Sequence, residues 1–125
     1  MFSYSTLGVN DMDRAIAFYD AVFAPLGRKR DTTSRTWTGY SEAGDKTKFF
    51  LTRPFNRQEA TGGNGTMLAF LAADRASVDA FHAAALAHGG RDEGPPGVRE
   101  GMKPVFYAAY VRDPDGNKLC AFVRK

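Results

Sequence analysis

Hydrophobic positions recur every three or four residues through residues 12–26, which is the period of a helix that packs one side on an apolar surface. The side chains that share this side are Phe18, Tyr19, Val22, Phe23 and Leu26. Asn10 or Asp11 is placed to cap the first amide groups, and Gly27 is placed to end the helix. The pattern therefore predicts an amphipathic helix with defined ends.

Strand-like patterns lie on both sides of this helix. In residues 3–9 polar and apolar residues alternate, so that Leu7 and Val9 share the face that would support the helix. Three more strand-like runs follow the helix, at residues 28–33, 36–43 and 47–53. Gly44 and Asp45 mark a hairpin between the last two runs.

The same plan returns 63 positions later. The matching pairs are Asp11 with Asp74, Phe18 with Phe81, and Gly27 with Gly90. A strand at 66–72 and a helix at 75–88 repeat the first two elements, and strands at 106–112 and 118–123 close the chain. The sequence DPDGN at 113–117 predicts a tight turn between these last strands, because proline presets φ and glycine accepts a positive φ. Two modules of one design are therefore expected.

Two irregular segments complete the plan. Residues 54–65 are polar, rich in glycine and without a clear period, which indicates a crossover loop. They divide a single domain into modules at about 1–53 and 66–125. Residues 89–104 are rich in glycine and proline, which favours one short strand and a loop that is able to fold over a pocket.

Composition narrows the class of protein. The 125 residues are 43% hydrophobic and 25% charged, as in an ordinary soluble globular domain. No apolar run approaches the roughly 20 residues that span a bilayer, and no secretory signal pattern is found. We therefore expect a cytoplasmic protein without a membrane partner. The single cysteine, Cys120, excludes an internal disulfide.

Charge argues against a nucleic-acid partner. The net charge is +3, and the basic residues are scattered apart from Arg28, Lys29 and Arg30. That triplet favours a solvated edge strand over an anion-binding patch. A nucleic-acid binder would carry a denser basic stripe or a recognisable reading helix.

Three segments together resemble the glyoxalase / bleomycin-resistance / extradiol-dioxygenase group, the vicinal oxygen chelate superfamily. They are YSTLGVNDMDRAIAFYDAVFAPLG (4–27), RPFNRQEATGGNGT (53–66) and VRDPDGNKL (111–119). The resemblance implies an α+β fold of two βαβββ modules, which form a curved mixed sheet around a cavity. It also implies a homodimer.

The resemblance further implies where a metal would bind. Family enzymes hold a divalent ion on inward-facing histidines and glutamates and leave open positions for substrate oxygens. In this chain the corresponding positions are Tyr4, Met67, Cys120 and a position near Phe50. These residues are not a ligand set for Zn, Ni, Fe or Mg. We therefore expect a chain that keeps the curved sheet and its cavity and has no metal cofactor.

The candidates for the cavity wall lie on the strands or beside the crossover loop. They are Tyr4, Trp37, Phe50, Arg53, Met67, Tyr107, Cys120 and Phe122. Aromatic walls bind flat apolar ligands, and an arginine suits a carboxylate or phosphate. Each also has a plain structural interpretation, since aromatic residues fill cores and a thiol without a nearby base is inert.

Two functions from different classes follow. The favoured one is a metal-free module that binds a small, partly aromatic or anionic molecule between the modules. The alternative is a metal-dependent lyase, isomerase or dioxygenase that uses carboxylates outside the aligned positions, namely Glu42, Glu59, Asp92, Glu93 and Glu100. Acid–base chemistry at Tyr4 or His82 is a third hypothesis, without support from spacing. Whether any reaction is catalysed stays open at this point.

Overall fold

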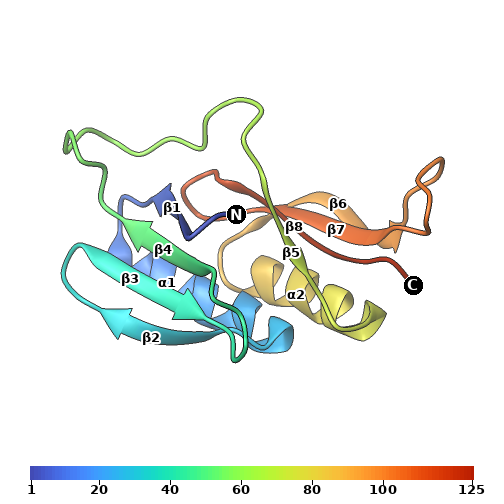
Figure 1. Cartoon of the computed structure of the whole chain (residues 1–125). Helices are drawn as coiled ribbons and strands as arrows, with labels where there is room; N and C mark the ends of the chain where they lie inside the picture. Colours follow the sequence, from blue (N-terminus) through green and yellow to red (C-terminus); the bar gives the residue numbers. More distant parts are fainter.

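The computed structural model describes residues 1–125 and contains two βαβββ modules (Figure 1). The first module consists of β1 (Tyr4–Gly8), α1 (Met12–Phe23), β2 (Lys29–Thr33), β3 (Trp37–Ser41) and β4 (Lys48–Thr52). Its sheet has the order β1-β4-β3-β2, with β1 parallel to β4 and the other neighbours antiparallel. A 3₁₀ turn at Ala24–Leu26 extends the helix, and Gly27 ends it in a left-handed conformation (φ 76°).

The second module repeats this order of elements. It consists of β5 (Leu68–Leu71), α2 (Arg75–Ala87), β6 (Arg91–Val98), β7 (Tyr107–Arg112) and β8 (Lys118–Val123). Its sheet has the order β5-β8-β7-β6, and again the strand that begins the module, β5, is parallel to the strand that ends it, β8. The α+β class and the two-module fold are thus confirmed. No helix is long and apolar enough to cross a lipid bilayer.

The predicted repeat is also seen in the hydrogen bonding. Asp11 caps α1 by accepting from the Arg14 amide at 3.0 Å, and Asp74 caps α2 by accepting from the Ser77 amide at 2.8 Å. Strand pairing is equivalent as well, because Thr6 lies opposite Phe50 in one sheet and Ala69 lies opposite Cys120 in the other. The offset of 63 between β1 and β5 therefore holds in the register of the sheets.

The glycines at the helix ends differ between the modules. In the second module Gly89 takes the left-handed conformation (φ 90°), so Gly90 is not the structural counterpart of Gly27. Gly90 is instead needed for close packing, since a Cβ there would lie 2.7 Å from Cε2 of Phe18. The sequence match at this position therefore hides a difference in role.

A single core joins the two modules. It contains 21 buried residues from α1, α2 and the helix-facing sides of both sheets. Phe23 of α1 is fully buried and contacts Phe49 of its own module and Phe70 of the other, with ring centroids 5.2 and 5.1 Å apart. Because the aromatic contacts cross the boundary between the modules, neither module buries its apolar face alone.

The DPDGN turn holds the second module to the first. Asp113 is buried and accepts hydrogen bonds from the Tyr19 hydroxyl at 2.6 Å and from the Asn117 amide at 2.9 Å. The Asn117 side chain in turn donates to the Gly8 carbonyl at 3.1 Å. Burial raises the pKa of the Asp113 carboxyl despite these donors. The turn predicted for a local hairpin therefore also connects β7 and β8 to β1 and α1.

The crossover loop is fixed by Asn10. Its side chain donates to the Ala60 carbonyl at 3.1 Å and accepts from the Ala60 amide at 2.7 Å, while its own amide donates to Asp115 at 3.0 Å. Asn10 therefore ties the loop to the DPDGN turn, and Asp11 alone caps the helix.

Candidate functional site

Each sheet presents one face to the helices and one face away from them. We name the outward faces by their residues, because side chains alternate across a strand. The first face carries Tyr4, Trp37 and Phe50 from β1, β3 and β4. The second face carries Phe106, Ala108, Tyr110, Cys120 and Phe122, which pack together apart from the main core.

The first face is an aromatic cluster that remains open. Phe50 lies between Tyr4 and Trp37, with ring centroids 5.5 Å from each and near-perpendicular planes. Tyr4 is 56% exposed and Trp37 is 40% exposed. Gly39 makes room for the Phe50 ring, since a Cβ there would lie 2.6 Å from Phe50 Cε1. The sequence thus holds three rings in place while leaving them accessible.

A cavity of about 530 Å³ lies beside this cluster. It is lined by residues of the first sheet and of the crossover loop, including Thr6, Trp37, Arg53, Phe55 and Glu59. The volume is within the usual range for small-molecule sites. The structure therefore brings two of the predicted residues, Trp37 and Arg53, to the same cavity.

The second face is more closed. Phe106 stacks on Phe122 with centroids 5.0 Å apart, and Cys120 is fully buried beneath this face. Burial raises the pKa of the Cys120 thiol to about 11. Burial also raises the pKa of Tyr110, which is the opposite neighbour of Cys120 on β7. The thiol is therefore protonated near neutral pH and is a poor nucleophile.

One predicted residue lies on the other side of its sheet. Tyr107 faces α2, where its hydroxyl donates to Asp79 at 2.6 Å and Arg75 lies over its ring. Tyr110 and Phe106, which sequence reasoning did not select, lie on the outward side instead. The signal was available, because the DPDGN turn pairs Arg112 with Lys118 and so places Tyr110 opposite Cys120.

The expected convergence of Tyr4, Met67 and Cys120 does not occur within one chain. Tyr4 and Cys120 lie on different sheets, and none of five cavities of about 200 to 550 Å³ is lined by both of them. Met67 is half-exposed, precedes β5, and lines none of these cavities either. The two faces therefore remain separate surfaces of the single chain.

The donor chemistry of the aligned positions does not fit a divalent metal. Phe50 has no donor atom, and the Cys120 thiol has a raised pKa, whereas a thiolate is the form that ligates. No group of three or more His, Cys, Asp or Glu side chains in the chain is placed to hold a metal ion.

The carboxylates of the alternative hypothesis are mostly engaged elsewhere. Glu42 lies 3.6 Å from Arg28, and Glu93 lies 2.9 Å from Arg112. Asp92 Oδ1 lies 2.9 Å from His82 Nε2, and this hydrogen bond lowers the pKa of the Asp92 carboxyl. Of the five, Glu59 lines the cavity beside Trp37.

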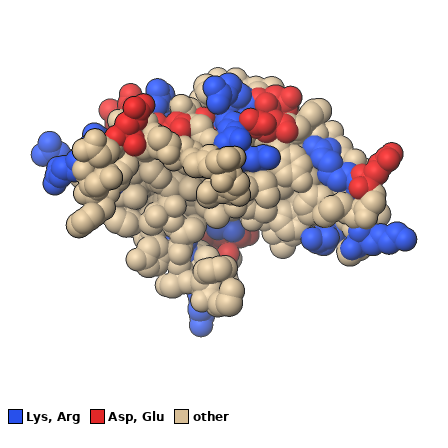
Figure 2. All heavy atoms as spheres, turned by 90° about the horizontal axis from the view of Figure 1, so that it is seen from above, with Lys and Arg blue, Asp and Glu red and all other residues tan.

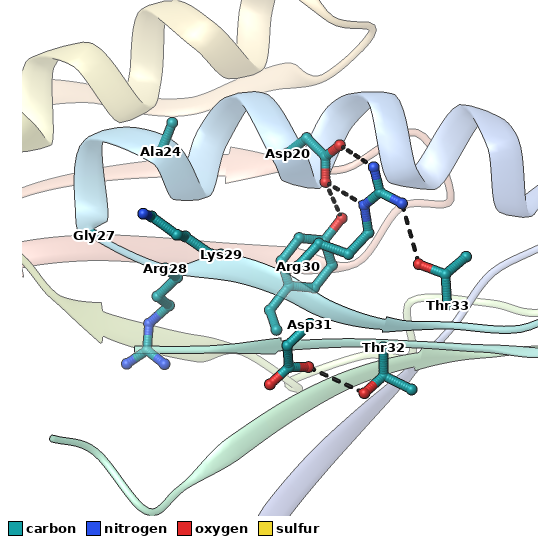
Figure 3. A pocket seen from close by; sticks show the side chains of 10 residues that line it. Asp20, Ala24, Gly27, Arg28, Lys29, Arg30, Asp31, Thr32 and Thr33 are labelled. Carbon is teal, nitrogen blue, oxygen red and sulfur yellow. Dashed lines mark hydrogen bonds and ion pairs between the residues drawn. The ribbon is translucent and has the colours of Figure 1, made fainter. Parts of the chain in front are cut away.

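A second cavity, of about 550 Å³, lies along β2 and is polar (Figure 3). Arg30 extends toward α1, where its guanidinium donates to both carboxylate oxygens of Asp20 at 3.1 Å. The Tyr40 hydroxyl also donates to Asp20, at 2.7 Å. Arg28 extends away from this helix, so the basic triplet does not form one patch. Figure 2 likewise shows basic side chains in separate groups, several of them beside acidic side chains.

Comparisons with known proteins agree with this architecture. Residues 2–121 match the family model of the Glyoxalase/Bleomycin resistance protein/Dioxygenase superfamily. A glyoxalase/bleomycin resistance protein from Albidiferax ferrireducens T118 is 44% identical, with a TM-score of 0.90 and 98% of each chain covered. Comparison with curated proteins gave no match.

More distant solved structures share the fold. A lactoylglutathione lyase from Agrobacterium tumefaciens is 22% identical, with a TM-score of 0.67 over 98% of this chain and 92% of the other. A fosfomycin resistance protein from Mesorhizobium loti is 18% identical, with a TM-score of 0.72 over 100% of this chain and 92% of the other. The family model and the 44% identical structure together confirm the resemblance inferred from the three sequence segments.

Proposed function

The chain belongs to the glyoxalase/bleomycin resistance protein/dioxygenase superfamily, and from this we propose that it is a metal-independent receptor for a small, partly aromatic or anionic molecule. The ligand binds on the outward sheet faces, where the superfamily has its cavity. The aromatic cluster of Tyr4, Trp37 and Phe50 supplies the apolar wall, and Arg53 supplies a cation at the edge of the adjoining cavity.

The observation that carries the proposal is which residues stand at the four positions where family enzymes hold their metal. The strand register makes Phe50 and Cys120 equivalent, and Tyr4 and Met67 are related by the same repeat. All four positions carry side chains that bind by area and polarizability instead of by metal coordination. The retained aromatic surface and the absent ligand set together support binding without a metal.

A second copy of the chain completes this site in the proposal. Within one chain, Tyr4 shares a cavity of about 290 Å³ with Leu68, Ala69 and Phe70 of β5 but with no residue of the second face, and the rings of Tyr4 and Trp37 remain open to solvent. A homodimer that sets the first face of one copy against the second face of the other would enclose a ligand from two sides. Sedimentation at micromolar concentration tests this part, and a monomer with or without ligand contradicts it.

Metal analysis of protein purified without chelators tests the central claim. We expect far less than one Zn, Ni, Fe or Mn ion per chain, together with thermal stabilisation by flat aromatic acids or amides. The Trp37→Ala variant should lose this stabilisation, whereas Leu86→Ala, an exposed apolar residue on α2, should keep it. A stoichiometric metal ion would favour the metal-dependent enzyme and contradict the receptor.

A further inference from the structure

Arg99 is held in one position by main-chain carbonyl groups. Its Nη1 donates to the Gly97 carbonyl at 3.1 Å, and its Nη2 donates to the Pro95 carbonyl at 2.7 Å. Its own amide donates to the Phe106 carbonyl at 2.9 Å, which fixes the start of the side chain. A guanidinium bound at both ends loses little freedom when it meets a ligand.

The sequence of β6 is suited to this arrangement. A Cβ at Gly94 would lie 3.2 Å from Nη2 of Arg99, and a Cβ at Gly97 would lie 3.4 Å from Nη1. The two intervening prolines donate no amide hydrogen bond, and the pairing of β6 with β7 is irregular between Gly94 and Gly97. Residues 94–97, with the sequence GPPG, therefore leave space and free carbonyl groups for the guanidinium.

The hydrogen bonds to the Gly97 and Pro95 carbonyl groups direct the Arg99 guanidinium onto the second face. Its guanidinium carbon lies 5.2 Å from the centre of the Tyr110 ring, and Lys118 Nζ lies 5.5 Å from the same ring. Arg124 lies over Phe106 and Phe122 at 5.0 and 5.6 Å. These cations flank the aromatic side chains of the face and Cys120 beneath them.

None of these three cations forms an ion pair. The ion pairs of the chain involve Arg14, Arg28, Arg30, Lys48, His82 and Arg112. No carboxylate of this chain therefore lies in direct ion-pair contact with these cations, although the pKa of the Asp92 carboxyl is lowered by His82 and, to a smaller extent, by the nearby Arg99. Since like charges that gather on an aromatic surface repel one another, an anion that binds there relieves this cost.

We propose that the second face selects a planar aromatic anion, whose carboxylate or phosphate is bound by Arg99 and whose ring lies against the accessible part of Phe122. This inference rests on the proposed function and specifies the charge and shape of its ligand. Arg99 is the principal partner because a positioned guanidinium forms paired hydrogen bonds to an oxyanion. Lys118 and Arg124 add charge around it.

The test compares 2-naphthoate with 2-naphthamide, which have the same ring system and differ in charge. Titration calorimetry at pH 7 on the full chain should give a dissociation constant at least about tenfold lower for the acid than for the amide. In Arg99→Gln the two constants should become equal, while Arg99→Lys should keep part of the preference. Arg91→Gln serves as the matched control, since Arg91 is exposed, unpaired and at the other end of β6.

The outcomes separate this inference from the function on which it rests. Equal binding of acid and amide by the unaltered chain, or a preference that survives in Arg99→Gln, overturns the anion selectivity and leaves the receptor function standing. Failure of both molecules to bind overturns the selectivity and removes support for the receptor as well. Circular dichroism of each variant excludes misfolding as the cause of lost binding.

Discussion

The first face and the second face occupy equivalent positions in the two modules, but the equivalent lysines on them have different partners. Lys48 and Lys118 both begin the last strand of their module. Lys48 is paired with Asp31 at 3.4 Å, and the Ser41 hydroxyl also donates to Asp31, at 2.6 Å. Lys118 instead lies over the Tyr110 ring and has no carboxylate partner.

This difference shows how a duplicated skeleton acquires two chemistries. Strand register fixes where a side chain emerges, so both lysines point to the outward side of their sheets. The edge strands of the two sheets then differ, because β2 supplies Asp31 to Lys48 whereas β6 supplies carbonyl groups to Arg99 and no carboxylate to Lys118. On the first face the lysine is paired and the rings are open, whereas the second face carries three cations without an ion pair and is more closely packed.

The largest expected effect concerns whether the two modules are separate folding units. Phe23→Ala should lower the free energy of unfolding by about 3–5 kcal/mol, since it removes a fully buried ring from the joint core. Denaturant unfolding should remain one transition, because Phe23 contacts Phe70 of the other module. Phe55→Ala, which alters an exposed ring, should leave stability unchanged. Two separate transitions in the variant would show that the modules are independent.

The equivalent positions Phe50 and Cys120 should differ in chemical reactivity. With its pKa raised to about 11, Cys120 should react with iodoacetamide about 10²-fold more slowly at pH 8 than in the unfolded chain, whose thiol pKa is about 8.5. The native rate should keep rising with pH up to 10, because the thiolate fraction grows until the pH reaches the raised pKa. In the unfolded chain the rate should level off above about pH 9.

Phe50→Cys in a Cys120→Ser background provides the comparison for that measurement. A thiol on the more open first face should react faster than Cys120 at every pH, as followed by mass spectrometry. Equal rates at the two positions would contradict the difference in burial.

The hairpin turns of the two modules should contribute unequally to stability. Asn117→Ala should cost about 1–3 kcal/mol, because it removes the side-chain donor to the Gly8 carbonyl and one of the several donors to the buried Asp113 carboxylate. Asp45→Ala, in the exposed turn between β3 and β4, should cost less, since Asp45 caps the Thr47 amide within its own turn. Urea unfolding of both variants measures the difference, and a larger loss for Asp45→Ala would refute a special role for the DPDGN turn.

The smallest expected effect concerns the two equivalent lysines. Lys118→Gln should weaken 2-naphthoate binding by about threefold, since an exposed cation contributes modestly. Lys48→Gln should leave binding unchanged, because its charge is already balanced by Asp31. Calorimetry on both variants checks this, and equal losses would mean that ion pairing on the first face does not matter for the ligand.

Sequence patterns predicted most of the elements and failed at particular contacts. The capped helices, the strands and the DPDGN turn follow from periodicity and turn chemistry within short segments. The placement of Tyr107 on the helix side was missed, although the DPDGN turn sets the register between β7 and β8 that specifies it. Within the irregular segment 89–104, residues 91–98 form an eight-residue strand, because they pair with β7 and because carbonyl groups of this strand accept hydrogen bonds from Arg99.

The sequence by itself determined that this chain folds as two related βαβββ modules, because periodicity and turn residues are local information. It also placed Tyr4, Phe50, Met67 and Cys120 where the family resemblance implies metal ligands, and it is these residue types that motivate the proposed metal-free function. Only the tertiary structure decided that Arg99 is fixed on the second face, that Lys48 is neutralised while Lys118 is not, and that the faces are separate within one chain. These features arise from contacts between residues far apart in the sequence, whose partners no local pattern specifies.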